Sequence, residues 1–390
     1  MSSGRNVQVD SVRGLAAISV FVFHATNRIE GLYGAPYHFL GHLNLGVRVF
    51  FLLSGYFIYR PFVQSHLRYG TGLAIGQYAW KRFWRIYPTY WLALAFAVAV
   101  GHTGVEGVSG VLKHGLLVQT YFRDRDGVGI GASWTLVVEV LLYLLIPLFA
   151  LIVRGLGRVI VRSRAELFAV SFIGLAAAAC LAPYSYDTGI FSSPGLPRVL
   201  GSAAFPVAIG MMLAVVESID LRHNLRARIT RVASPIGRWW LGAVLVLLLL
   251  VFFLADSFAN PDRPTKGFEW FNLQWGHSAI AMLLVAPLVL APDAGGRMRA
   301  FLCRRSLVMV GTISFSFYLW HIRVLKVISD LGWFDSLGSA IPAALVAFGV
   351  SIGLASLSQR YVEATCAKVA ARWPMRVAEP AHDLEKLVRH

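Results

Sequence analysis

Long apolar stretches separated by short polar segments recur along the whole chain of 390 residues. Each stretch is close to the roughly 20 apolar residues that a helix needs to cross a bilayer. The pattern predicts an all-α, polytopic integral membrane protein with about ten transmembrane helices. The predicted spans are 10–28, 46–64, 86–102, 132–153, 166–183, 197–216, 239–256, 274–291, 307–327 and 339–360.

Composition and charge support this interpretation. Hydrophobic residues make up 57% of the chain and charged residues only 14%, whereas soluble domains carry roughly 25% charged residues. A net charge of +16 is typical of a nucleic-acid-binding protein, but roughly two thirds of the Lys and Arg residues fall in alternate loops, on the side of the N-terminus. The charge therefore predicts two cytoplasmic termini in the plasma (inner) membrane and requires no nucleic-acid partner.

The polar segments are too short to form a separate soluble domain. We expect one membrane domain over residues 1–365 and a cytoplasmic C-terminal tail over 366–390. The segment 72–85 mixes aromatic residues with Lys81, Arg82 and Arg85, just before Pro88. This mixture is typical of an amphipathic helix at the cytoplasmic membrane surface.

Ionisable residues inside predicted spans are costly and therefore mark candidate functional positions. The first span carries Asp10 and Arg13 at its cytoplasmic end, where we expect a helix-start ion pair, and His24 in its outer third. Arg13 and His24 are eleven residues apart, which returns to nearly the same helix face after a rise of roughly 16 Å. One face thus presents a cation at the cytoplasmic mouth and an imidazole deep in the membrane.

Two further spans place polar residues at a similar depth. Glu139 lies about two turns below the outer boundary of the fourth span, with Tyr143 one turn deeper. The ninth span carries Ser314, Tyr318 and His321 at helical spacing, and this polar stripe ends in the outer third. Together with the histidine of the first span, these residues predict a shared functional site.

Other interpretations of these residues remain open at this point. A single intramembrane His or Glu is more often a structural hydrogen-bonding group, and Ser and Tyr stripes commonly join helices. The same residues also suit the proton relay of a transporter or flippase, which would need no acyl-CoA. His38 and His42 have the spacing of metal ligands, but no Cys or carboxylate supports them, so no metal is expected.

Five segments resemble the motifs of acyltransferase family 3, a family of membrane-bound acyltransferases that modify extracytoplasmic sugars, lipids and some antibiotics. They occur in the family's order and extend over nearly the whole chain: 9–17 followed by Phe23-His24, 46–58, 81–88, 133–139 with Tyr143 and Pro147, and 313–321.

The resemblance implies transfer of an acyl group, commonly acetyl, from cytoplasmic acyl-CoA to a hydroxyl of an extracytoplasmic glycan, glycolipid or small molecule. It implies acyl-CoA as a donor substrate and no tightly bound cofactor. Arg48 replaces an Asp found in many members, Val140 and Leu141 replace polar residues, and Arg323 replaces a common Pro. These departures bear on the class of acceptor. A scaffold without activity would not need to retain both Arg13 and His24.

The residues can be given roles in such a reaction. His24 is the predicted general base, since the unperturbed pKa of histidine, about 6.5, is close to working pH. Glu139 would orient its imidazole, and Tyr318, His321 or Arg48 would donate hydrogen bonds to the developing oxyanion. The catalytic set is thus His24, Glu139 and His321.

The remaining candidates are predicted to bind substrate. Arginine suits phosphate groups, and the three arginines of the predicted cytoplasmic mouth would hold the phosphates of CoA. The predicted substrate-binding set consists of Arg13, Arg48, Arg82, Arg85, Tyr318, Ser314, Trp134 and Tyr143.

Overall fold

The computed structural model describes residues 6–29, 38–68, 75–101, 103–122, 129–159, 196–223, 266–291 and 297–372. Within these ranges every regular element is helical, which confirms the all-α prediction. The helices are α1 (Val7–Thr26), α2 (His38–Gly41), α3 (Leu45–Arg68), α4 (Ile75–Val100), α5 (Gly107–Gly115), α6 (Trp134–Val159), α8 (Leu196–His223), α10 (Lys266–Leu290), α11 (Arg297–Leu302), α12 (Arg305–Asp330), α13 (Leu337–Ser358) and α14 (Ala364–Ala371), with a π-helical segment η5 (Gln359–Glu363) and short 3-10 turns between some of them.

Several described helices are suited to a membrane. Five are long and apolar enough to cross it: Val7–Thr26, Ile75–Val100, Gly131–Gly155, Arg305–Asp330 and Leu337–Ala371, while Ala203–Ser218 and Trp275–Leu290 are shorter apolar helices. The predicted spans 166–183 and 239–256 lie outside the described residues. The total of ten spans and the orientation of the termini therefore stay predictions.

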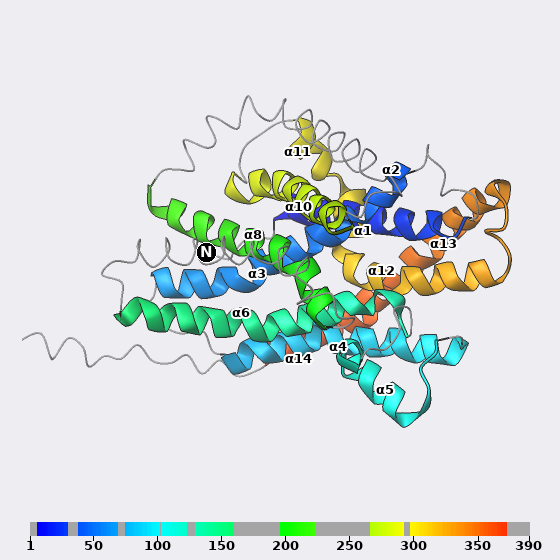
Figure 1. The fold of residues 1–390 in the computed structure, drawn as a ribbon, viewed down its shortest axis with the longest axis horizontal. Helices are drawn as coiled ribbons and strands as arrows, with labels where there is room; N and C mark the ends of the chain where they lie inside the picture. Colours follow the sequence, from blue (N-terminus) through cyan, green and yellow to red (C-terminus); the bar gives the residue numbers. More distant parts are fainter. Residues whose placement is uncertain are drawn as a thin grey trace, which may run out of the picture.

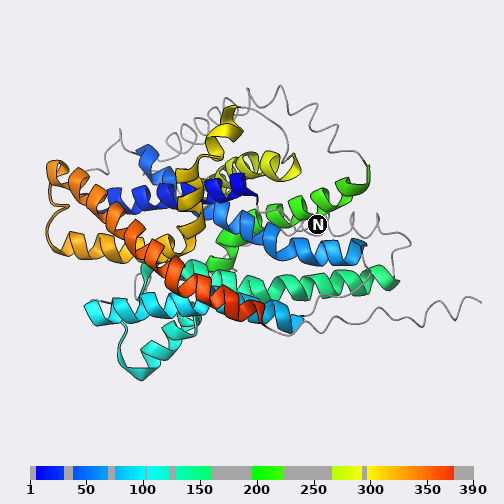
Figure 2. The same cartoon turned by 180° about the vertical axis from the view of Figure 1, so that it is seen from behind.

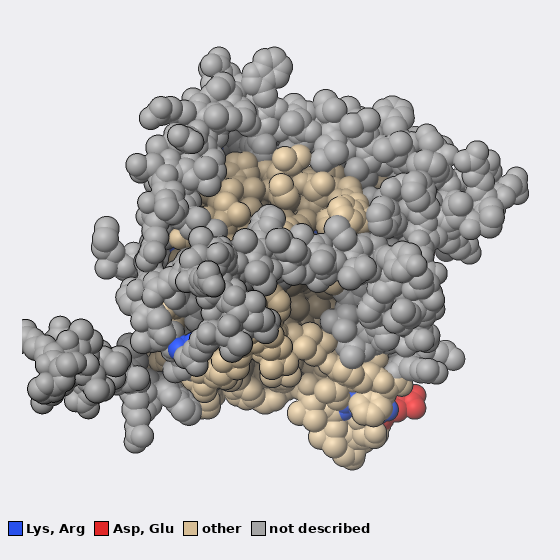
Figure 3. All heavy atoms as spheres, turned by 60° about the vertical axis from the view of Figure 1, so that its left-hand side comes forward, with Lys and Arg blue, Asp and Glu red and all other residues tan. Residues whose placement is uncertain are grey.

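The long helices run roughly side by side, with α5 projecting from one side of the bundle (Figure 1). Seen from behind, α13 crosses the other helices obliquely and continues toward α14 (Figure 2). On the face drawn in Figure 3, most of the described surface is uncharged and only a few Lys, Arg, Asp and Glu side chains appear. Such a surface is suited to contact with lipid.

Two glycines bring α1 and α12 into close contact. A Cβ atom on Gly311 would lie 1.9 Å from the backbone oxygen of Asp10, and one on Gly14 would lie 2.7 Å from the nitrogen of Gly311. Close approach of helix backbones at small residues is a common mode of packing in membranes. This crossing sets Arg13 of α1 beside Ser314 of α12.

A second glycine crossing joins α3 to α8. A Cβ atom on Gly210 would lie 1.9 Å from the backbone oxygen of Leu52, and one on Gly55 would lie 2.2 Å from that of Val207. This crossing holds α3, which lines the cavities described below, against α8.

A buried ion pair also ties α3 to α8. Arg60 donates to both carboxylate oxygens of Glu217, at 2.7 and 2.8 Å, and Tyr56 donates to the same carboxylate at 2.9 Å. A paired and hydrogen-bonded charge of this kind is the form in which a buried carboxylate is tolerated.

The structure bears on two predicted boundaries. The described parts of the amphipathic segment 72–85 and of the span 86–102 join in one continuous helix, α4, that passes through Pro88. Proline removes one backbone hydrogen bond, but packing against neighbouring helices can hold such a helix together. The predicted domain boundary at residue 365 falls inside α14, which continues from α13 through the π-helical segment.

Candidate functional site

A pocket of about 100 Å³ lies between α1, α3, α4, α6 and α12. We call it the central pocket. Its lining consists of Arg13, Val47, Phe50, Phe51, Leu53, Ser54, Phe57, Ile58, Arg82, Arg85, Thr135, Leu136, Glu139, Ser314, Phe315 and Tyr318. The structure thus brings together six of the predicted site residues, which come from four separate helices.

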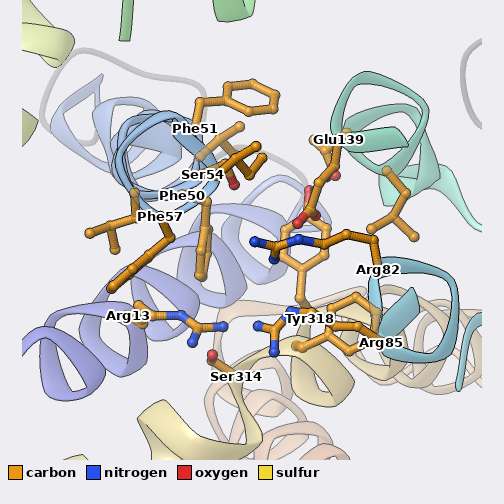
Figure 4. A pocket seen from close by; sticks show the side chains of 16 residues that line it. Arg13, Phe50, Phe51, Ser54, Phe57, Arg82, Arg85, Glu139, Ser314 and Tyr318 are labelled. Carbon is orange, nitrogen blue, oxygen red and sulfur yellow. Dashed lines mark hydrogen bonds between the residues drawn. The ribbon is translucent and has the colours of Figure 1, made fainter. Parts of the chain in front are cut away.

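The charged groups of the pocket face one another (Figure 4). Arg13 and Arg85 extend toward each other near Ser314, while Arg82 points toward Glu139. The phenylalanines of α3 cover the opposite wall. The pocket therefore has a polar, mainly cationic side and an apolar aromatic side.

Glu139 accepts a hydrogen bond of 2.6 Å from the hydroxyl of Tyr143. The guanidinium of Arg82 lies 5.0 Å from the centre of the Tyr143 ring and 5.3 Å from that of Tyr78. Cation–π contact of this kind holds the guanidinium in place. In the described part of the chain, no hydrogen bond joins Glu139 to His24, so the predicted role of Glu139 in orienting that imidazole stays a prediction.

Tyr318 links the central pocket to the histidines. Its side chain lines the pocket, and its hydroxyl lies 3.1 Å from the hydroxyl of Thr135. On its other side, its ring centre is 5.5 Å from that of His321. The tyrosine is thus positioned between the arginine-lined space and the imidazoles.

His24 and His321 lie side by side, with ring centres 5.4 Å apart. His321 is fully buried, and its Nδ1 lies 3.2 Å from the backbone oxygen of Phe317. A proton on Nδ1 would satisfy this contact and leave Nε2 with a lone pair. Among the described residues Nε2 has no hydrogen-bond partner. The pair can therefore accept or pass a proton.

Three predicted substrate-binding residues, Arg48, Trp134 and Tyr143, lie outside the lining of the central pocket. Trp134 packs edge-on against Phe51 with ring centres 6.0 Å apart, so it supports the aromatic wall. Arg48 has its Nε buried without a hydrogen-bond partner in the described part of the chain.

A larger cavity of about 800 Å³ adjoins the central pocket. We call it the basic vestibule. Arg13, Arg82, Arg85 and Phe315 line both spaces. The remaining lining is Asp10, Pro61, Gln77, Tyr78, Lys81, Trp84, Thr312, Gln359, Glu363, Ala364, Cys366, Ala367, Ala370 and Ala371. Four basic side chains thus face two carboxylates, and the small residues of α14 leave room opposite α4.

The expected ion pair at the start of α1 is present. Arg13 lies 4.0 Å from the carboxylate of Asp10, close to the limit for such a contact. The guanidinium therefore keeps donor groups directed toward both cavities.

Glu363 is a candidate that the sequence analysis missed. It ends the π-helical segment η5, lines the basic vestibule and accepts a hydrogen bond from Ser316. The charges of Arg85 and Arg13 act on its carboxylate. π-Helical turns are frequent at functional sites, but the sequence pattern does not predict them. The one available signal was a Glu just beyond the last predicted span.

The histidine pair considered as a metal site is arranged differently. His42 lies 3.2 Å from His277 of α10, nitrogen to nitrogen, and the side chain of His38 is outside the described set. Within the described residues, no cluster of three or more His, Cys, Asp or Glu side chains is placed to hold a metal ion.

Comparison with known proteins gives the same family as the motifs. The family model described as "Acyltransferase domain", acyltransferase family 3, matches residues 6–359. No solved structure matches the chain.

Curated relatives match over most of their length. Acyltransferase MdmB of Streptomyces mycarofaciens is 26% identical over 97% of this chain and 97% of its own. Exopolysaccharide production protein ExoZ of Rhizobium meliloti is 27% identical over 80% of this chain and 86% of its own. Nodulation protein 10 of Rhizobium leguminosarum is 24% identical over 85% of this chain and 86% of its own. With its several apolar helices and a family match across nearly its whole length, this chain belongs to acyltransferase family 3 and is a multi-pass membrane acyltransferase.

Proposed function

We propose that this enzyme transfers an acyl group, acetyl first among the candidates, from acyl-CoA on the cytoplasmic side to a hydroxyl on the other side of the plasma (inner) membrane. The observation that carries the proposal is the pair of adjoining cavities, which share three arginines and lead past Tyr318 to a pair of histidines. This arrangement suits two substrates, a long anionic acyl donor and an acceptor hydroxyl that gives up its proton to a histidine.

The basic vestibule is the proposed site of the nucleotide part of CoA. Its volume of about 800 Å³ falls within the size range of small-molecule sites. Arg13, Lys81, Arg82 and Arg85 offer charge-assisted hydrogen bonds to the phosphates. Trp84 has a buried indole N–H without a hydrogen-bond partner among the described residues, and it lines the same space. Its ring offers a face on which a base can stack.

The thioester would occupy the central pocket. In the proposed reaction, His24 takes the proton from the acceptor hydroxyl as its oxygen bonds to the thioester carbonyl carbon. The carbon–sulfur bond then breaks, and the CoA thiolate takes up a proton. Tyr318 would donate a hydrogen bond to the oxyanion, with Arg48 as a further donor, and His321 would do so once its Nε2 carries a proton. Glu139 would hold Tyr143 and Arg82 in place beside the reacting group.

The acceptor is proposed to be a glycan, a glycolipid or a small molecule. The name of one relative supports the glycan class, because ExoZ is described as an exopolysaccharide production protein. No tightly bound cofactor is expected, since the acyl group comes from a soluble donor.

The test is release of thiol from acetyl-CoA and longer acyl-CoAs by purified protein in detergent, with mixed envelope glycans as acceptors. We expect His24→Gln to lower the rate at least about a hundredfold, which is within the usual contribution of a general base. His114→Gln changes a buried histidine of α5 that lines neither cavity and serves as the control. Substantial acyl transfer by a folded His24→Gln protein would overturn the assignment of the base.

A further inference from the structure

Two arginines, one just after α1 and one in α12, form no ion pair with a carboxylate in the described part of the chain. Arg28 follows α1, in a turn in which its backbone N–H bonds to the oxygen of Ala25. Arg323 lies in α12, two residues after His321, and is only 7% exposed. In the described part of the chain, Nε of Arg28 and both Nε and Nη2 of Arg323 are buried without a hydrogen-bond partner.

The nearby charges leave these arginines incompletely neutralised. Arg28 and Arg323 repel each other, and the described carboxylate that acts on both is that of Asp330. Asp330 also forms an ion pair of 2.7 Å with Lys326. A buried cation without full compensation is destabilising, so an arrangement of this kind implies a ligand that supplies negative charge.

Arg28 follows the proposed base, His24, by four residues, and the charge of Arg28 also acts on Arg323. The charge of Arg28 acts on both His24 and His321. In the predicted topology, Arg28 and Arg323 lie toward the outer side of the membrane. Basic residues are less frequent on that side than on the cytoplasmic side. The acceptor, unlike the donor, reaches the histidines from that side.

We propose that Arg28 and Arg323 bind an anionic group of the acceptor, a carboxylate or a phosphate, and so hold a neighbouring hydroxyl at the histidine pair. The planar guanidinium offers paired N–H donors that match both groups. This inference rests on the proposed function and narrows the acceptor to acidic or phosphorylated sugars. Arg323, which departs from the family's common proline, then acts as a specificity residue.

The test compares acceptors that differ only in their charge. Thiol release from acetyl-CoA is measured with phenyl glucuronide against phenyl glucoside, and with glucose phosphate against glucose. The first pair tests a carboxylate and the second a phosphate. We expect the wild type to favour one acidic acceptor by about ten- to a hundredfold in kcat/KM, as for a hydrogen bond to a charged group.

Arg28→Gln and Arg323→Gln should each lower this preference about tenfold. Lys113→Gln removes a cation from α5, away from the histidines, and should keep the wild-type preference. Equal kcat/KM for charged and neutral acceptors in the wild type would overturn the inference. The inference would also fail if the two arginine variants kept the wild-type preference for the acidic acceptor and lost only a dependence of the rate on anionic lipid. The arginines would then bind lipid headgroups.

Binding without turnover separates this inference from the proposed function. The acidic acceptor should raise the unfolding temperature of the wild type in the absence of any donor, and should do so less for Arg323→Gln. Stabilisation without acyl transfer from any donor would support the anion site and contradict the proposed reaction. Acyl transfer without any preference for charged acceptors would support the proposed reaction and contradict the anion site.

Discussion

Glu363 sets a carboxylate among the arginines that are proposed to bind the phosphates of the donor. Ser316 holds it by a hydrogen bond, and the charges of Arg85 and Arg13 act on it. In the empty vestibule it neutralises part of this positive charge. When the donor binds, its phosphates must share the same arginines with the carboxylate. Glu363 is therefore predicted to weaken donor binding and to favour release of CoA.

Replacing Glu363 by the isosteric Gln should tighten CoA binding about tenfold at low salt, because one repulsive charge is removed from the site. The difference in CoA affinity between Glu363→Gln and the wild type should become smaller at higher salt, because salt screens the charges. Glu363→Asp keeps the charge and should bind CoA like the wild type. Isothermal titration with CoA measures all three proteins.

Glu106→Gln removes a carboxylate before α5, far along the chain from the vestibule lining, and is the matched control. A weaker affinity in Glu363→Gln would show that the carboxylate supports donor binding and would contradict this prediction.

At the scale of elements, the crossing of α1 and α12 positions the residues of the candidate site. The two helices supply Arg13, His24, Tyr318 and His321, and their relative position depends on contact at Gly14 and Gly311. A shift of either helix would separate the imidazoles and would also move Arg13 away from Ser314. Function at this site thus depends on backbone approach as much as on the functional side chains.

Gly311→Ala should destabilise the protein by about 1–3 kcal/mol, the usual cost of overpacking. The added Cβ atom would lie 1.9 Å from the backbone oxygen of Asp10, and that atom cannot move without the helix. Gly349→Ala in α13 meets no atom within 4 Å and should be neutral or stabilising. Thermal unfolding in detergent compares the two variants, and equal stability would contradict the close-packed crossing.

At the scale of the whole molecule, the proposed reaction requires the vestibule and the histidine pair to face opposite sides of the membrane. The predicted topology places the loop containing Cys303 inside and the segment before α5 outside. Cys303 is exposed, as a labelling experiment needs.

In a Cys180→Ala Cys366→Ala background, a membrane-impermeant maleimide should label Cys303 only after the cells are opened. With Cys303→Ala added, Glu106→Cys should be labelled in intact cells. Labelling yields are compared by mass shift before and after permeabilisation. The reverse pattern would invert the topology and would place the basic vestibule on the wrong side for cytoplasmic CoA.

The apolar stretches and the motifs were sufficient to predict the helical class, the family and the acyltransferase activity. Span length and the cost of intramembrane charge are local properties, so residues such as His24, Glu139 and His321 stand out in the chain itself. Helical spacing also predicted a similar depth for all three, and the structure brings the ring centres of His24 and His321 to 5.4 Å. Their catalytic roles stay predictions.

Only the tertiary structure decided which polar groups are neighbours. Glu139 accepts a hydrogen bond from Tyr143, one turn along its own helix, and its predicted role toward His24 stays a prediction. Glu363 reaches the arginines because α13 continues through a π-helical turn into α14, and this part of the helix packs against α4. The charge of Arg28 acts on Arg323 because α1 and α12 pack side by side. Such contacts depend on helix rotation and close packing between residues far apart in the chain, and helical periodicity alone specifies neither.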